Sequence, residues 1–186
     1  MHTTLVPEPI KLTYQDYCAL PDDGRRYEIL DGDLYMSPSP ESLHQSIVLN
    51  LAANLRSHVK AHGLGKVFVA PLDVLLSEHN IVEPDLIYVS RARRSIITQK
   101  NIQGAPDLLV EVLSPSNSER DLRDKRNIYA RCGVRFYWLI DPQARSITEL
   151  ELVEGAYAVV AVTSGSSNLS PKLFPGLQIS LEELWE

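Results

Sequence analysis

The fold is decided by residues 107–141, which read DLLVEVLSPSNSERDLRDKRNIYARCGVRFYWLID. The leucine- and valine-rich run at 107–113 and the aromatic run at 136–141 are typical of strands. Residues 118–131 between them are typical of a helix, and Gly133 follows its expected end. A span of this length fits a right-handed strand–helix–strand crossover, so we predict that the two strands are parallel.

Shorter elements are predicted on both sides of this crossover. Asp31-Gly32 supplies the positive φ angles of a tight hairpin turn, Ser39-Pro40 is a candidate helix start, and Gly63 is a candidate helix end. The predicted elements are helices at 13–20, 43–59 and 181–185, strands at 66–70, 73–77 and 85–90, and hairpins at 27–36 and 147–162.

The composition is that of one ordinary globular domain. The chain has 186 residues, of which 44% are hydrophobic and 23% are charged. We therefore expect a single domain over 1–186, with a core at about 43–141, an N-terminal helix and hairpin at 13–36, and a C-terminal hairpin and tail at 147–186.

The formal net charge of −6 counts against a broad basic surface for polyanions. One local basic cluster, Arg91, Arg93, Arg94 and Lys100, either lines a groove or forms a solvated loop.

No apolar run is long enough to span a bilayer, and the first residues lack the pattern of a signal peptide. We therefore expect a cytoplasmic protein with no membrane partner. Cys18 and Cys132 form no CxxC pair, so we expect reduced thiols and no disulfide framework.

Common catalytic motifs are absent. The sequence has no dinucleotide-binding GxGxxG, no P-loop and no GxSxG, and the stretch from His58 to His62 lacks the glutamate of a zinc protease. These two histidines either share a metal ion at i, i+4 spacing or lie at an exposed helix end.

The first unusual acid is Glu111, which stands inside the apolar run LLVEVL at 108–113. Strand alternation places it on the same side as Leu109 and Leu113. An unpaired buried carboxylate is costly, so a partner is required: an arginine, a hydrogen-bonded core group or a metal ion.

The second unusual acid is Asp85, which begins a predicted strand directly after Pro84. If the strands of Asp85 and Glu111 are antiparallel, their Cβ atoms lie about 5 Å apart, whereas parallel strands separate them by about 15 Å or more. Two close carboxylates favour a hard cation such as Mg²⁺. In the alternative interpretation Asp85 caps a turn and Glu111 pairs with a basic residue.

Lys125 is the candidate partner of these acids. It shares a helical stripe with Leu122, Tyr129 and Cys132, so we expect its side chain to point toward the sheet. The alternative is an exposed i, i+4 ion pair with Asp121.

Taken together, several motifs resemble the Uma-two-type family of restriction endonucleases. They are YEILDG at 27–32, His44, EPDL at 83–86, APDLLVEVLSPS at 105–116, the Asp121-xxx-Lys125-xxx-Tyr129 spacing, and GVxxYWxxD at 133–141.

The resemblance implies the PD-(D/E)XK nuclease fold. The expected fold class is therefore α/β, with a restriction-endonuclease-like core, a mixed central sheet flanked by helices, and additional N- and C-terminal β-hairpins. By resemblance, Asp85 is the motif aspartate, Glu111 the second acid and Lys125 the basic residue of the motif. The basic residue has here moved from two residues past Glu111, where position 113 is leucine, to the following helix.

Two further positions match the family. Glu28 is an auxiliary metal ligand by resemblance, or else an ordinary hairpin acid. His44 is a group that positions water or contacts phosphate by resemblance, or else a histidine on a helix face.

The expected function is Mg²⁺-dependent hydrolysis of DNA phosphodiester bonds, with Mn²⁺ as a substitute and Asp85 and Glu111 as metal ligands. Because duplex symmetry mirrors protein symmetry, we expect a homodimer. One alternative is a degenerate nuclease fold that only binds nucleic acid or a protein partner. Another is a structural domain in which Lys125 neutralises Glu111.

Overall fold

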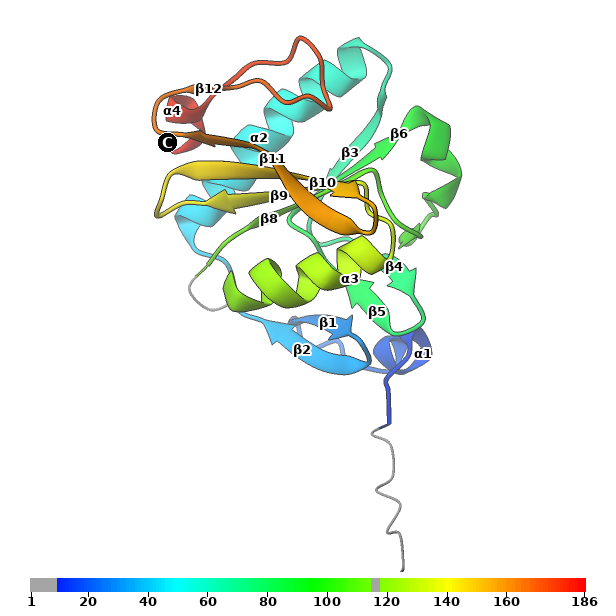
Figure 1. The fold of residues 1–186 in the computed structure, drawn as a ribbon. Helices are drawn as coiled ribbons and strands as arrows, with labels where there is room; N and C mark the ends of the chain where they lie inside the picture. The colour runs from blue at the N-terminus through cyan, green and yellow to red at the C-terminus, as the bar shows by residue number, and fades with distance from the viewer. Residues whose placement is uncertain (1–9, 115–117) are drawn as a thin grey trace, which may run out of the picture.

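A computed structural model describes residues 10–114 and 118–186 of the chain (Figure 1). Its helices are α1 Tyr14–Cys18, α2 Ser42–Ala61, the 3-10 helix η1 Arg91–Ile96, the π-helix η2 Arg120–Lys125, α3 Arg126–Arg131 and α4 Leu181–Leu184. Its strands are β1 Arg26–Leu30, β2 Asp33–Ser37, β3 Gly65–Val69, β4 Val74–Ser77, β5 Asn80–Val82, β6 Leu86–Ser90, β7 Ile102–Gln103, β8 Leu108–Val112, β9 Phe136–Asp141, β10 Ser146–Val153, β11 Ala156–Ser164, β12 Asn168–Leu169 and β13 Ile179–Ser180.

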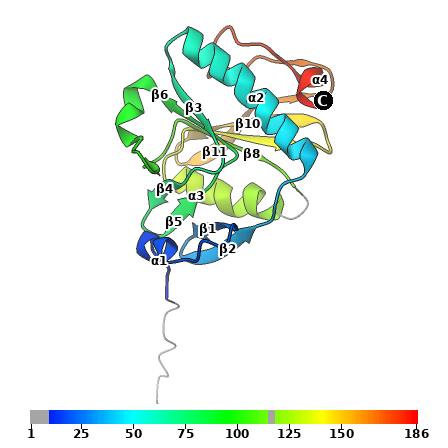
Figure 2. The same cartoon turned by 180° about the vertical axis from the view of Figure 1, so that it is seen from behind.

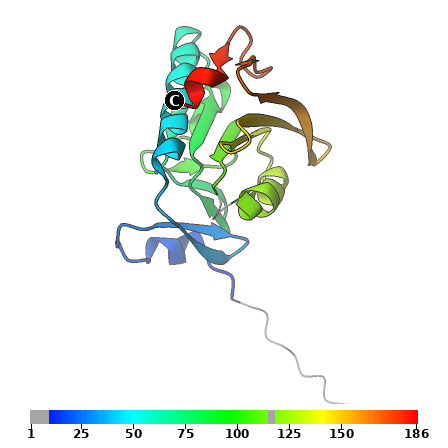
Figure 3. The ribbon, with the colours of Figure 1, turned by 90° about the vertical axis from the view of Figure 1, so that its left-hand side faces the viewer.

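The larger sheet has six strands in the order β11-β10-β9-β8-β6-β3. Strands β8 and β9 pair in parallel, as the crossover predicted, and the other neighbours pair antiparallel. Helix α2 covers one face of this sheet and α3 covers the other, as Figures 2 and 3 show. The result is the expected mixed sheet flanked by helices, with the C-terminal hairpin β10–β11 added at one edge.

Each face of the large sheet has its own core. On the α2 face, the buried helix residues Ile47, Leu51, Leu55 and Val59 recur at helical spacing and pack against alternate residues of β6 and β8. Phe174 and other residues of the C-terminal tail complete this cluster. On the α3 face, the remaining residues of the same strands pack against the helix. Because helices cover both faces of the sheet, a central strand such as β8 has apolar side chains on both of its sides.

A second sheet, with the order β2-β1-β5-β4-β7, lies beside the first. Its hairpin β1–β2 turns at Asp31 and Gly32, whose φ angles of 52° and 90° confirm the predicted tight turn. A side chain at position 32 would meet Lys11, because an added Cβ would lie 2.6 Å from the Lys11 Cβ. Glycine at this position therefore allows both the turn and the close approach of the N-terminal segment.

Some predictions about individual elements were wrong. Helix α2 begins after Glu41, not at Ser39-Pro40, because residues up to Glu41 keep an extended backbone. Residues 80–82, for which no strand was predicted, form β5. Asn80 is tolerated there because its side chain accepts a hydrogen bond from the Asp31 backbone and donates one to Ser77. The expected strand at 73–77 is confirmed as β4, and it belongs to the smaller sheet.

The start of one predicted helix and the end of another are confirmed. Thr13 forms a capping box with Asp16 at the start of α1, and Gly63 follows the end of α2 with a φ of 62°. Both cysteines are free. Residues 115–117, part of the SPS motif, lie outside the described residues. Within residues 10–114 and 118–186, no helix combines the length and apolar composition needed to cross a membrane.

The packing of α2 gives a direct test of the core. Leu55→Ala removes a fully buried side chain and should reduce the free energy of unfolding by about 2–5 kcal/mol. Leu49→Ala, on the same helix but 69% exposed, is the matched control and should change it by less than about 0.5 kcal/mol. Urea unfolding followed by tryptophan fluorescence measures both. Equal losses in the two variants would contradict this account of the core.

Candidate active site

A cavity of about 530 Å³ opens at the carboxyl ends of the parallel strands β8 and β9. Ligands of open α/β sheets usually bind at such an edge. The segment from Ser37 to His44, which links the small sheet to α2, forms one wall. Asp85, Glu111 and Lys125 all line the cavity, so the structure brings the three predicted residues together.

The two acids meet because of the strand register. Strands β6 and β8 are antiparallel, and Leu86 lies opposite Val110. Continuing that register by one residue places Asp85 opposite Glu111. The antiparallel alternative of the sequence analysis is therefore confirmed, and both carboxylates reach the same cavity.

Asp85 is held from two sides through one oxygen. Its Oδ2 accepts a hydrogen bond from the Val112 backbone N–H at 2.8 Å and lies 3.1 Å from Nε2 of His44. His44 comes from the first turns of α2, so it lies at the site as expected. Its Nδ1 is buried and has no hydrogen-bond partner among the described residues. No described residue bonds to Oδ1 of Asp85, which leaves that oxygen for a ligand.

Glu111 is similarly fixed through one oxygen. Its Oε1 accepts hydrogen bonds from the Lys125 ammonium at 3.0 Å and from the Tyr129 hydroxyl at 2.7 Å. Burial raises the pKa of Glu111 well above its usual range, although the nearby charge of Lys125 opposes this rise. The second oxygen, Oε2, has no partner among the residues that the structure describes.

Lys125 is the centre of a buried ionic cluster. Its Nζ lies 3.0 Å from Glu28, 3.0 Å from Glu111 and 3.5 Å from Asp121, and only 5% of its side chain is exposed. Burial alone would lower the pKa of Lys125, but the three carboxylates outweigh it and raise that pKa well above its usual range. This arrangement therefore favours the protonated, cationic form of the lysine.

The π-helix explains a wrong prediction about this helix. Leu122 was expected on the inward stripe, yet it is 46% exposed, while Asp121 is buried. A π-helical turn holds more residues than an α-helical one, so positions i and i+4 stay aligned while i and i+3 rotate apart. Asp121 therefore lies beside Lys125, and their predicted i, i+4 pair exists in the site instead of on the surface.

Asp121 is the main site residue that sequence reasoning missed. Burial raises its pKa to about 6, and Lys125 opposes that rise. The Asp121-xxx-Lys125 spacing was visible in the sequence, but only the π-helix shows that both side chains point inward. Tyr129, on the same stripe, also contributes its hydroxyl to the site.

Glu28 joins the site from the small sheet. Its Oε1 accepts a hydrogen bond from the Glu83 backbone N–H at 2.9 Å and contacts Lys125. Glu83 in turn pairs with Arg26, whose Nε lies 2.7 Å from Oε2 of Glu83. Glu28 is therefore not an exposed hairpin acid, and it ties the small sheet to the ionic cluster.

The donor set fits magnesium better than zinc. Among the described residues, no three His, Cys, Asp or Glu side chains are arranged to hold a metal by themselves. Asp85 and Glu111 offer one unbonded oxygen each, and Mg²⁺ typically takes one or two carboxylates, several waters and substrate phosphate oxygens. Together with Asp85, the three carboxylates around Lys125 make four acids beside one lysine, and a divalent cation would offset part of this negative charge.

Comparison with known proteins identifies the family. The family model Uma2, described as "Putative restriction endonuclease", matches residues 14–182. The chain belongs to this family. The resemblance inferred from the motifs is thereby confirmed.

A solved structure shares the fold. It is described as "a putative nuclease belonging to DUF820" from Anabaena variabilis ATCC 29413, and it matches with a TM-score of 0.77 and 22% sequence identity, over 95% of this chain and 98% of that chain. This likeness shows that the two chains share a fold, and it is consistent with the expected restriction-endonuclease-like fold. No curated protein matches the chain.

The ionic cluster predicts a pH-dependent stability. Lys125→Met leaves buried carboxylates without their cation and should cost about 3–5 kcal/mol of unfolding free energy at pH 8. A carboxyl group whose pKa is raised on folding binds its proton more tightly in the native state, so native stability falls as pH rises from the unfolded to the folded pKa. Because the variant raises the pKa values of Asp121 and Glu111 further, its deficit should be smaller at pH 5. Urea unfolding at both pH values measures this.

The control for this prediction is Arg123→Met, which removes an exposed cation from the same π-helix. It should change stability by less than about 0.5 kcal/mol at either pH. A Lys125→Met deficit that is the same at pH 5 and pH 8 would show that packing, not charge, is the dominant loss.

Proposed function

We propose that this chain is a metal-dependent endonuclease that hydrolyses DNA phosphodiester bonds, with Mg²⁺ held by Asp85 and Glu111. One observation carries the proposal. The carboxylates of Asp85 and Glu111 lie opposite each other, and each uses one oxygen for hydrogen bonds to the protein while its other oxygen is left for a ligand. The buried ammonium group of Lys125 lies beside them. The family description supports a nuclease. The metal ion is inferred from the site, and the DNA substrate is inferred from the description of the family as restriction endonucleases.

When bound there, Mg²⁺ would lower the pKa of a coordinated water and offset charge on the scissile phosphate. The chain's own residues have positioning tasks. The Val112 N–H and His44 fix the orientation of Asp85, and Tyr129 with Lys125 fixes that of Glu111. Preorganised groups of this kind do not have to reorient during the reaction.

Lys125 has a narrower role than the resemblance implied. The carboxylates around Lys125 raise the pKa of its ammonium group, which favours the protonated form of the lysine. Its ammonium can donate hydrogen bonds and stabilise negative charge that develops beside Glu111. We therefore assign Lys125 to orienting the attacking water and offsetting charge, and not to general-base catalysis.

Removal of either metal-binding carboxylate should abolish cleavage. Asp85→Asn and Glu111→Gln each keep the side-chain shape but remove a charge, and we expect at least about 100-fold slower nicking of plasmid DNA in Mg²⁺ or Mn²⁺. EDTA should stop the wild-type reaction. Glu182→Gln, an exposed acid on α4, is the control and should cleave as the wild type does. Gel assays of supercoiled plasmid measure the rates.

Metal binding provides an independent readout. Mn²⁺ binding followed by electron paramagnetic resonance should be lost in Asp85→Asn and Glu111→Gln and kept in Glu182→Gln. Full cleavage by either carboxylate variant would reject the assignment. Nucleic-acid binding without turnover, across divalent ions and with RNA as well as DNA, would instead favour the degenerate binding module.

We also propose that the protein is a homodimer, and sedimentation velocity tests this oligomeric state.

A further inference from the structure

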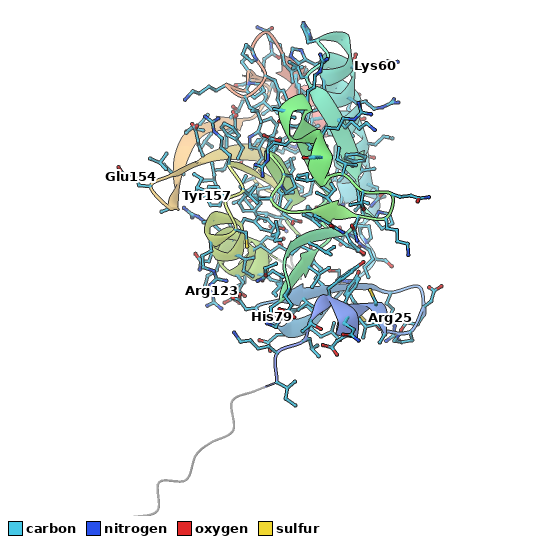
Figure 4. The ribbon with its side chains drawn as sticks, turned by 90° about the vertical axis from the view of Figure 1, so that its right-hand side faces the viewer. Arg25, Lys60, His79, Arg123, Glu154 and Tyr157 are labelled. Atoms are coloured by element: carbon cyan, nitrogen blue, oxygen red, sulfur yellow. The ribbon has the colours of Figure 1, made fainter. Side chains whose placement is uncertain are left out.

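A second hollow, of about 560 Å³, lies at the other end of β6 from the candidate active site. Strand β6 begins next to Asp85 and ends at Ser90, which lines this hollow. The end of α2, the edge strand β3 and the 3-10 helix η1 form its walls. Figure 4 shows Lys60, which belongs to one of these walls, at the opposite end of the molecule from Arg25. Arg25 directly precedes β1, the first strand of the small sheet.

Five cations line this hollow, and the period of each element explains why. Arg56 and Lys60 are at i, i+4 on α2 and share one face. Arg91 and Arg94 are at i, i+3 on η1, where a 3-10 helix aligns them. Lys66 adds a fifth from β3. Arg91 and Arg94 belong to the basic cluster noted in the sequence, so that cluster contributes to a groove.

These cations are not neutralised by the protein. Within the described residues none of the five has an ion pair, and no acidic residue lines the hollow. Seven other cations in the described part of the chain do have acidic partners, namely Arg25, Arg26, Arg123, Lys125, Arg131, Arg135 and Lys172. Like charges at i, i+4 destabilise a helix, and the chain as a whole has a net charge of −6. Five clustered and unpaired cations in such a chain indicate an anionic ligand.

The lining indicates which anion. It has no aromatic ring to stack on a base, and all five basic side chains are exposed and extend from an open surface. Exposed lysines and arginines in this arrangement are typical of sequence-independent contacts to the sugar-phosphate backbone, which displace condensed counterions. A compact site for one small phosphate ester would instead use buried donors.

Helix α2, which extends from the candidate active site to this hollow, has no acidic side chains. All twenty residues of Ser42–Ala61 lack Asp and Glu. From His44 at the active site to Lys60 at the hollow, the helix rises about 24 Å. That length corresponds to about seven base pairs of B-DNA.

We propose that this hollow is a second contact site for the phosphate backbone of duplex DNA, about seven base pairs from the scissile phosphate. The proposal rests on the proposed function for its choice of DNA as ligand. The hollow would hold the duplex independently of sequence and of the divalent metal ion, because all of its charged side chains are cationic.

The test is DNA binding in EDTA, where no cleavage occurs. Fluorescence anisotropy with a labelled 24-base-pair duplex should show that Lys66→Gln/Arg94→Gln binds about tenfold more weakly than the wild type at 50 mM salt. The slope of log affinity against log salt should become shallower by about 2, because two phosphate contacts are lost. The matched control, Arg123→Gln/Lys172→Gln, removes the same charge from exposed, paired cations and should bind as the wild type does.

Each outcome is decisive. Equal weakening in both double variants would mean that net charge alone matters, and it would overturn the proposal. So would wild-type affinity in Lys66→Gln/Arg94→Gln, or a titration in which inorganic phosphate binds at this hollow while duplex binding does not depend on it. If the backbone contact is confirmed but Asp85→Asn cleaves normally, the proposed active site fails and this site stands.

Discussion

The burial of one ammonium group among three carboxylates is the constraint on which the site depends. Lys125 reaches Glu111 on the large sheet, Glu28 on the small sheet and Asp121 on its own helix. A charged group this deeply buried is stable only with close partners, so the two sheets and the helix must be held in one arrangement. The cluster therefore fixes how the small sheet docks and, at the same time, gives the active-site carboxylates their orientation.

Strand direction supplies the second requirement. An antiparallel β6–β8 pair brings the start of one strand to the end of the other, so Asp85 and Glu111 face a common cavity. The parallel β8–β9 pair forces a crossover, and that crossover returns a helix over the same strand ends. The lysine can then be supplied from the helix instead of from position 113, which is leucine and lies after the end of β8.

Sequence reasoning predicted the elements whose signals are local. The turn at Asp31-Gly32, the strand Phe136–Asp141 and the parallel crossover follow from residue types and spacing alone. It failed where tertiary contacts decide. The π-helix turns Asp121 inward to contact Lys125, and no local helix signal in the sequence marks that turn. Strand β5 is short, and it pairs with β1 and β4 of the smaller sheet. The positions of Asp85 and Glu111 were predictable because an acid in an apolar strand requires a partner.

The distribution of charge along the molecule links the two sites. A cavity with an excess of carboxylates would repel a DNA duplex at long range unless a metal ion offsets it, and the net charge of −6 adds to that repulsion. Unpaired cations at the far end of α2 provide an attraction that does not depend on the metal. In the proposed scheme, attraction and catalysis lie at opposite ends of α2, and the length of this helix sets the separation of the two contacts. The cation cluster is then needed because the active site itself is acidic.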